Sequence, residues 1–589
     1  MIMKKTRTQW LLENLKGVKG LYVLGIIGAI VYNIMQLTVP FIISNLIDLF
    51  ITGENAAYNL ATNKTLFYTY IGVMIGLTFL RTCIVYGTGM LFEYVSQEFL
   101  YRVRNFLYNK VQRQDMKFYS TYRTGDLMTR LTGDLDACRH MLAWVIKTIV
   151  ESLALFGATM VYFFMMDWLL ALIILLIAPC IFLIIIKFKN EVGPKHRNLR
   201  EKLAQMNTAA QENISGNRVV KAFAREDYEI KRFDEANVDF AENNVDTALT
   251  WLKYFPIVET FANIMPVCLL VVGGLFIISG RLTFGEYAAF NGLIWAVQNP
   301  MRNLGSVMNE FQRFHAASAK VMEIFYSEPE IIDSPDAIDR PERFKGEVEF
   351  KNVSFKYDDG PLPILHDISF TVKPGETVAI MGETGCGKTS LIHLIPRFYE
   401  ATQGEVLIDG INVKDMKLHQ LRKNIGLATQ DVLLYSDTID GNIAYGDDNL
   451  PKEEVVKFAR YSAASDFIAK MPEGYETIVG ERGVGLSGGQ KQRISLARAL
   501  AVKPAILILD DTTSAVDMET EKEIQQHLAE LDFTCTKIII AQRISTTKNA
   551  DKILVLQDGR ITEMGTHEEL IQKHGYYWNL VALQTGEEV

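Results

Sequence analysis

The chain has 589 residues, of which 49% are hydrophobic and 22% are charged, and its formal net charge is -9. A chain of this length is too long for one compact core, so we expect at least two domains. The charge is spread over both halves without a basic tract, which excludes nucleic acid as an expected partner.

Long apolar stretches dominate the first part of the chain. A helix needs about 20 apolar residues to cross a bilayer, and several stretches meet or approach this length. Buried core helices of a soluble protein would explain the two shortest stretches alone, but not the set. We therefore predict an all-α transmembrane domain over residues 1–326, with six long helices that extend into the cytosol. The expected spans lie near residues 20–47, 66–95, 141–166, 168–187, 255–280 and 285–310.

Basic residues near the ends of these stretches indicate their orientation. Lys and Arg precede the first span and follow the second, whereas the loop near residues 51–63 is followed by only Lys64. Because Lys and Arg concentrate on the cytosolic side of membranes, both termini are expected in the cytosol. Ahead of the first span, a short helix in the membrane interface is predicted from Trp10, Leu11, Leu12 and Leu15 among basic residues.

Four charged residues fall within or beside the expected spans: Arg81, Lys147, Glu151 and Glu259. Charges inside a membrane are costly, so each is a candidate for function. Two interpretations stay open at this point. These side chains line a cavity for cargo, or they join helices to one another and mark the cytosolic helix ends.

Residues 327–345 form the expected linker, because Pro329, Pro335 and Pro341 among acidic residues disfavour both helix and strand. The remainder, residues 346–589, alternates charged and apolar residues as a soluble α/β domain does. A second domain of different class is therefore predicted after the linker.

The most specific pattern of this second domain is a phosphate-binding loop of the form G-x-x-x-x-G-K-[ST]. A β-rich run over residues 376–381 predicts the strand before it, and residues 390–395 predict the helix after it. Glycines let backbone N–H groups close around phosphates, while the lysine and the hydroxyl serve the phosphates and magnesium. The candidate residues are Gly382, Glu383, Thr384, Gly385, Cys386, Gly387, Lys388, Thr389 and Ser390.

A second motif, Leu486 to Gln490 with the sequence LSGGQ, resembles the signature of the ABC ATPase family. Other motifs of that family occur in order: Tyr357, Gln430, a Walker B strand over residues 506–510 and a D-loop over residues 514–517. The chain therefore resembles a type IV half-transporter of the ABC transporter superfamily, with an α/β P-loop ATPase domain. Residues 125–134 resemble the first coupling segment, which docks on the ATPase domains in that family.

The resemblance implies ATP and Mg²⁺ as cofactors, with a role for each matching residue. Tyr357 would stack on adenine, Lys388 would bind the β- and γ-phosphates, Thr389 and Asp510 would bind magnesium, and Gln430 would serve magnesium and the attacking water. In this family two ATPase domains meet head to tail, so the signature of one chain meets the ATP of the other. The signature residues of this chain are Ser487, Gly488, Gly489 and Gln490. They lie at the N-terminus of a predicted helix, which favours anions.

Two positions depart from the family pattern. Asp511 stands where a catalytic glutamate normally follows the Walker B aspartate, and Gln542 stands where the switch loop normally has histidine. Aspartate shortens the carboxylate arm, and a displacement of about 1 Å can cost about 10²-fold in rate. Glutamine donates a hydrogen bond to phosphate but carries no positive charge. This site is therefore expected to bind ATP and to hydrolyse it slowly or not at all.

These residues together predict an ATP-hydrolysing translocase, one subunit of a heterodimeric exporter in a bacterial plasma membrane. Its expected partners are a second half-transporter, membrane lipid and an amphipathic or lipophilic cargo. The partner would supply the glutamate and the histidine that this chain lacks, so that its site, completed by LSGGQ of this chain, is the active one.

Two alternatives stay open. One is a slow homodimeric exporter, and the other is an ATP-gated channel or regulatory membrane subunit that shares every motif above. An importer is disfavoured, because importer spans and ATPases usually occupy separate chains in this superfamily.

Overall fold

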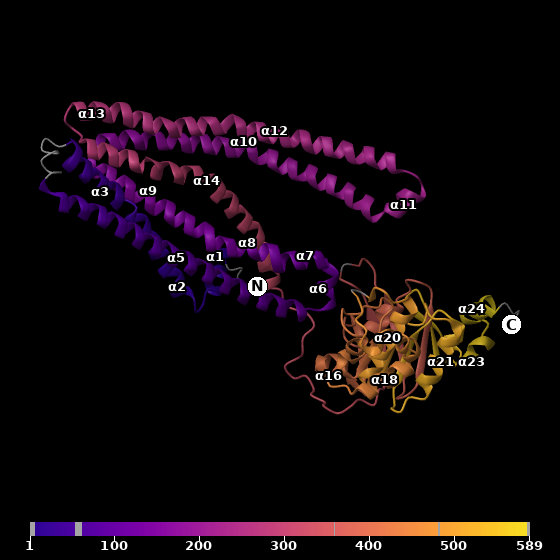
Figure 1. Ribbon diagram of the computed structural model, residues 1–589. Helices are drawn as coiled ribbons and strands as arrows, with labels where there is room; N and C mark the ends of the chain where they lie inside the picture. The colour runs from indigo at the N-terminus through magenta and orange to yellow at the C-terminus, as the bar shows by residue number, and fades with distance from the viewer. Residues whose placement is uncertain (1–5, 53–61, 359, 481–482, 586–589) are drawn as a thin grey trace. The chain divides into compact units, whose positions relative to one another are not determined.

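The computed structural model describes residues 6–52, 62–358, 360–480 and 483–585 (Figure 1). Most of the loop expected near residues 51–63 lies outside them. The chain divides into two compact units, Met1–Gln112 with Arg123–Ser327, and Arg113–Tyr122 with Glu328–Val589. The first is helical and the second combines helices with two β-sheets, so the predicted fold class is confirmed.

Helices make up the first unit, and two of them, α10 and α12, run side by side with the short α11 at the turn between them (Figure 1). The α-helices are α1 (Arg7–Asn14), α2 (Lys19–Met35), α3 (Thr38–Ile47), α5 (Lys64–Gln112), α7 (Thr124–Thr129), α8 (Leu135–His140), α9 (Ile146–Met166), α10 (Trp168–Ser215), α11 (Asn217–Ala222), α12 (Glu226–Cys268), α13 (Gly274–Ile278) and α14 (Phe284–Phe325). Short π-helical turns at Asp48–Thr52, Arg130–Asp134, Met141–Val145 and Leu269–Gly273 continue α3, α7, α8 and α12.

Among the residues that the structure describes, five helical runs are long and apolar enough to cross a membrane: Lys19–Thr52, Lys64–Gln112, Thr124–Met166, Trp168–Ser215 and Glu226–Ile278. The segment expected as a sixth span lies in α14, which is not among them. Its first half contains Glu286, Asn291, Gln298 and Asn299, and these polar side chains lower its mean hydropathy. Phe290, Leu293 and Val297 of the same helix are buried in the core of the unit. The helix α14 is therefore apolar mainly where it meets other helices.

Side-chain caps fix where two of the long helices begin. Asp167 accepts a hydrogen bond from the backbone N–H of Leu170 at 2.9 Å and so caps α10. The same carboxylate pairs with Arg281, which precedes α14, at 2.5 Å. Thr283 and Glu286 form a capping box at the start of α14. Because such caps satisfy backbone N–H groups that have no partner within the helix, they set these helix starts.

The charged residues in the expected spans have protein partners. Arg81 of α5 lies 5.8 Å from the ring centre of Tyr32 in α2. Glu259 of α12 pairs with Arg302 of α14 at 2.7 Å, and Lys147 lies 3.9 Å from Glu151. The contacts of Arg81 and Glu259 favour the interpretation that these charges join helices to one another, whereas Lys147 and Glu151 lie in the same helix, α9.

The short helix α1 is present as predicted, but its expected place in the membrane interface is wrong for Trp10. The Trp10 side chain is 0% exposed and meets the rings of Phe99 and Phe325 edge to face, with centres 5.7 and 5.8 Å away. Leu11 and Leu15 are also buried, whereas Leu12 is 53% exposed. The apolar face of α1 is therefore covered by the helices α5 and α14 rather than by lipid.

The segment that clusters with the ATPase unit is Arg113–Tyr122, which contains α6 (Met116–Thr121). Asp115 caps α6 and also accepts a hydrogen bond from the backbone N–H of Glu330 at 2.8 Å. Lys117 pairs with Glu330 at 2.6 Å and with Asp358. The expected coupling segment, residues 125–134, belongs instead to the helical unit. The coupling role of residues 125–134 stays a prediction.

The second unit contains two sheets. One has the strand order β2-β1-β4-β5 and the other β10-β9-β3-β8-β7-β6. The strands are β1 (Val348–Phe355), β2 (Leu365–Val372), β3 (Thr377–Gly382), β4 (Gln403–Ile408), β5 (Ile411–Asn412), β6 (Ile425–Ala428), β7 (Ile506–Asp510), β8 (Thr536–Ile540), β9 (Lys552–Gln557) and β10 (Arg560–Gly565).

Helices connect and cover these strands. The α-helices are α15 (Lys388–His393), α16 (Leu418–Lys423), α17 (Ile439–Ile443), α18 (Lys452–Tyr461), α19 (Ser465–Ala469), α20 (Gly488–Ala501), α21 (Met518–Ala529), α22 (Ile544–Thr547), α23 (His567–Gln572) and α24 (Tyr576–Thr585). Strand β7 is buried along its whole length, as expected for a parallel strand covered on both faces. The ATPase unit therefore has the α/β architecture that its pattern predicted.

Replacing Trp10 by alanine should lower the stability of the helical unit by roughly 3–5 kcal/mol, because a fully buried large aromatic leaves a cavity. Thermal unfolding of the full chain in detergent measures the loss. Leu12→Ala is the matched control, since Leu12 lies on the exposed side of the same helix. Equal effects of the two changes would contradict the buried role of Trp10.

Candidate nucleotide site

The candidate site lies at one edge of the six-stranded sheet. Strands β3, β8, β7 and β6 are neighbours and run parallel, so their carboxyl ends meet at the same edge. Ile380 and Asp510 are both paired with Ile540, which places the ends of β3, β7 and β8 at one level. Ligands of open parallel sheets bind at this edge.

Four predicted groups follow these four strand ends. The phosphate loop follows β3, Gln542 follows β8 after one residue, Asp511 directly follows β7, and the exposed Gln430 lies two residues after β6. The fold therefore brings together residues that are spread over more than a quarter of the sequence.

The phosphate loop needs glycine at particular positions. Gly385 and Gly387 have φ angles of +88° and +102°, which side chains rarely adopt. A Cβ atom on Gly387 would lie 2.9 Å from Leu365 Cδ2. Glu383, Thr384 and Gly385 are exposed at the open side of the loop.

Lys388 brings a positive charge into this loop. Its Nζ donates hydrogen bonds to the backbone oxygens of Gly382 at 2.8 Å and Glu383 at 2.6 Å, and lies 3.8 Å from Cys386 Sγ. The ammonium group is therefore held against the loop backbone, where it complements the negative charge of phosphate oxygens.

Thr389 and Asp510 form an oxygen pair beside the loop. Thr389 Oγ1 donates to Asp510 Oδ2 at 3.2 Å, and Asp510 is 5% exposed. Burial raises the pKa of the Asp510 carboxyl, while the Thr389 hydrogen bond opposes this shift. Carboxylate and hydroxyl oxygens are ligands that Mg²⁺ accepts, and a cation there would favour the ionised carboxylate. The residues present therefore fit a magnesium site.

The two residues that depart from the family pattern lie next to each other. Gln542 Nε2 donates to Asp511 Oδ2 at 3.4 Å. Burial, and then the neighbouring Asp510 charge, raise the pKa of the Asp511 carboxyl, and Arg543 and Lys388 oppose this shift. Asp511 has a φ angle of +49°, a left-handed conformation that aspartate tolerates better than most residues. Asp511 and Gln542 thus form one polar group beside Asp510.

Tyr357 lies beside the helix that follows the phosphate loop. Its hydroxyl is 3.0 Å from Ser390 Oγ, and its ring meets those of Phe355 and Tyr399 edge to face. An aromatic ring near the phosphate loop suits an adenine base, which stacks on such rings.

The signature residues form a separate group at the start of α20. Ser487 caps this helix by accepting from the backbone N–H of Gln490, and Gln490 Oε1 accepts from the backbone N–H of Ser487 at 2.9 Å. A Cβ atom on Gly489 would lie 2.7 Å from the backbone oxygen of Ala515, and one on Gly488 would lie 3.5 Å from Ala515 Cβ. The signature therefore packs against the D-loop of its own chain.

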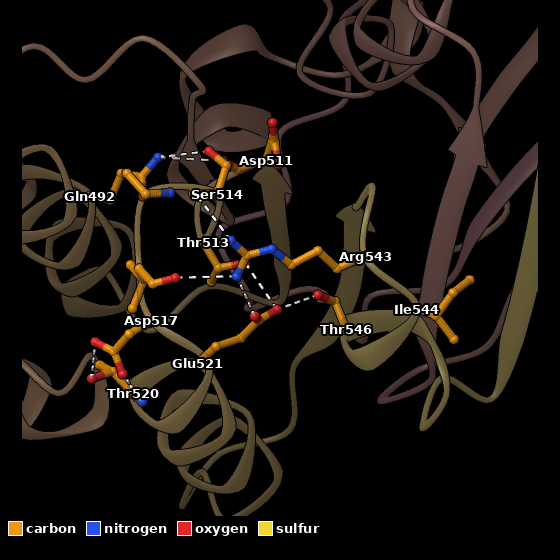
Figure 2. Close-up of polar contacts among 12 residues, drawn as sticks. Gln492, Asp511, Thr513, Ser514, Asp517, Thr520, Glu521, Arg543, Ile544 and Thr546 are labelled. Atoms are coloured by element: carbon orange, nitrogen blue, oxygen red, sulfur yellow. Dashed lines mark hydrogen bonds and ion pairs between the residues drawn. The ribbon is translucent and has the colours of Figure 1, made fainter. Parts of the chain in front are cut away.

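Three polar residues around the D-loop were not predicted. Gln492 of α20 and Glu521 of α21 are 6% and 2% exposed, and Arg543 follows Gln542 directly (Figure 2). The sequence offers a signal for Glu521 alone, because it lies at helical spacing from the apolar Ile524 and Leu528.

The fold and the site define a membrane protein that has its apolar helices and a P-loop nucleotide site in one chain. Residues 22–301 match the ABC transporter transmembrane region and residues 365–514 match the ABC transporter domain. The chain belongs to the ABC transporter family. It is an ATP-hydrolysing membrane transporter of the multidrug and lipid exporter type.

Two bacterial relatives and one solved structure illustrate the similarity. The ATP-dependent lipid A-core flippase of Syntrophus aciditrophicus is 37% identical over 86% of this chain and 84% of its own length. A putative multidrug export ATP-binding/permease protein of Bacillus subtilis is 35% identical over 96% of this chain and 97% of its own. A bacterial Atm1-family ABC exporter with ATP bound is similar in structure, with a TM-score of 0.80 and 28% identity, over 97% of this chain and all of that chain.

Replacing Lys388 by methionine should weaken ATP binding by roughly 10- to 150-fold, because a hydrogen bond to a charged group contributes about 1.5–3 kcal/mol. Titration with a fluorescent ATP analogue in the absence of turnover measures the change. The control is Lys452→Met, which removes an exposed lysine that pairs with Glu476. Unchanged affinity in Lys388→Met would contradict the proposed phosphate contact.

Proposed function

We propose that this chain is one subunit of a heterodimeric exporter, and that its own phosphate loop forms the weakly hydrolytic ATP site. The observation that carries this proposal is the pair formed by Asp511 and Gln542, which meet at 3.4 Å beside the magnesium ligands. Both positions differ from the family pattern, and the two altered side chains are in contact with each other.

The proposed chemistry follows from the residues at the sheet edge. Tyr357 holds the base, Lys388 and the loop backbone hold the phosphates, and Thr389 with Asp510 hold magnesium, which neutralises phosphate charge when bound. Gln430 and Asp511 orient the attacking water from two neighbouring strand ends. The Asp511 carboxylate is one methylene shorter than a glutamate, so it reaches that water poorly. Gln542 donates a hydrogen bond but adds no positive charge as phosphate charge develops.

The signature of this chain would serve a different ATP. Ser487, Gly488, Gly489 and Gln490 pack on the D-loop of their own chain and present a helix start that favours anions. We infer that this helix start completes the site of the partner half-transporter, where hydrolysis is fast. A second copy of this chain is the alternative partner, which would give a slow homodimer.

The proposed cargo is an amphipathic or lipophilic compound, either drug-like or lipid-like. This proposal is supported by the names of relatives that export drugs or flip a lipid. We further propose six membrane spans, with α14 as the sixth, and both termini and the ATPase domain on the cytosolic side of a bacterial plasma membrane. The linker over residues 327–345 would join the two domains there.

Replacing Asp511 by glutamate together with Gln542 by histidine should raise ATP hydrolysis of the purified chain by about tenfold or more. The change restores the reach of the carboxylate and a side chain that can carry positive charge. Release of inorganic phosphate at saturating ATP measures the rate. Asp511→Asn with Gln542→His is the matched control, because it lacks the carboxylate and should stay slow. If the double variant is no faster than the native chain, Asp511 and Gln542 do not limit hydrolysis, and the proposal of a weakly hydrolytic site is contradicted.

The chain expressed alone should hydrolyse ATP slowly and co-purify with a second half-transporter when taken from its native membrane. The partner should have glutamate and histidine at the positions of Asp511 and Gln542. Turnover in proteoliposomes, with and without that partner, measures the dependence. Vigorous hydrolysis and cargo uptake by this chain alone would contradict the heterodimer, and single-channel currents opened by ATP would favour a channel.

A further inference from the structure

Glu521 of α21 is a buried carboxylate with no part in the chemistry proposed above. It is 2% exposed, and its oxygens accept hydrogen bonds from Arg543 Nη1 at 2.9 Å, from Thr513 Oγ1 at 3.3 Å and from Thr546 Oγ1 (Figure 2). A buried carboxylate is costly unless it is paired and hydrogen-bonded. The donors come from two different segments of the chain: Thr513 follows β7, whereas Arg543 and Thr546 follow β8.

Arg543 extends this contact to the D-loop. Its Nη1 also donates to the backbone oxygen of Val516 and its Nη2 to that of Ser514, each at 3.2 Å. Arg543 directly follows Gln542, whose side chain meets Asp511. One guanidinium therefore joins the switch loop to two carbonyl groups of the D-loop.

Gln492 holds the D-loop from its other side. Its Nε2 donates to Ser514 Oγ at 3.2 Å, and its Oε1 accepts from the backbone N–H of Ala515 at 3.2 Å. Gln492 lies in the first turns of α20, the helix that begins with the signature. The D-loop is thus fastened between the signature helix and the switch loop of the same chain.

We propose that Glu521 is a positioning residue that, through Arg543, fixes Gln542 and the signature helix relative to each other by way of the D-loop. This inference rests on the proposed function, because it assigns Gln542 to the chain's own ATP and the signature to another. In the described part of the chain, no hydrogen bond or ion pair joins Glu521 to the phosphate loop or to Asp510. Without its carboxylate, Arg543 loses the acceptor that holds its guanidinium against the D-loop carbonyls, and both loops become free to shift. A shift of about 1 Å would cost up to about 10²-fold in rate.

Hydrogen exchange of the full chain tests the positioning without any need for turnover. In Glu521→Gln, exchange should rise together at residues 513–517 and 541–547, while residues 382–390 keep their native protection. The matched control is Glu400→Gln, which removes the charge paired with the buried Arg397 at 2.6 Å in another part of the same unit. The control should lower stability without opening either loop. Faster exchange confined to α21 or spread over the whole unit would overturn the proposal.

Turnover provides the second test, in the chain that carries Asp511→Glu and Gln542→His. Adding Glu521→Gln should lower kcat about tenfold or more and leave KM for ATP within about twofold, because the binding loop is intact. Arg543→Lys keeps the charge opposite Glu521 but loses the planar fork, so it should give a smaller loss of kcat. If Glu521→Gln fails to fold, Arg543→Lys serves in both experiments.

An unchanged kcat, or equal losses in kcat and affinity, would overturn the positioning role. If the double variant is no faster than the native chain, the proposed weak site fails, while the exchange experiment still decides the role of Glu521. The two proposals can therefore fail separately.

Discussion

Parallel pairing of β3 with β8 and of β8 with β7 is the constraint on which the nucleotide site depends. Both pairs share Ile540, so the phosphate loop, Asp510 and the switch loop leave the sheet at one level. Parallel strands require long crossovers, and the longest of these carries the signature helix α20 from β6 to β7. The same pairing therefore gathers the candidate ATP ligands and supports the helix that begins with the signature.

Within this site, adjacent carboxylates set the electrostatics. Asp510 and Asp511 lie at the buried end of β7, and burial raises the pKa of both, with the Asp510 charge adding to the shift of Asp511. Lys388 opposes both shifts, and Arg543 opposes that of Asp511. Gln542 meets the shorter Asp511 arm with a neutral donor. The two departures from the family pattern are therefore in direct contact with each other.

The parts of the structure that depend on local spacing could be predicted from the sequence. The phosphate loop with its strand and helix, the order of domains and the apolar helices follow from residues close together in the chain. The place of Trp10 could not be predicted, because an amphipathic helix has the same pattern whether lipid or protein covers its apolar face. The grouping of Arg113–Tyr122 with the second unit could not be predicted either, because it depends on contacts with residues far along the chain, such as Glu330.

The pair of Glu521 and Arg543 could not be predicted for the same reason, since it joins α21 to the loop after β8 and no sequence periodicity reveals that contact. This contact matters for the start of α20, where the signature residues lie. The capping box of Ser487 and Gln490 satisfies two backbone N–H groups of the first turn, whereas the N–H groups of Gly488 and Gly489 have no intrahelical acceptor. These glycines abut the D-loop and not the phosphate loop of their own chain. The helix start that suits an anion is therefore held by the D-loop of its own chain, which is the contact that the proposed role of Glu521 would fix.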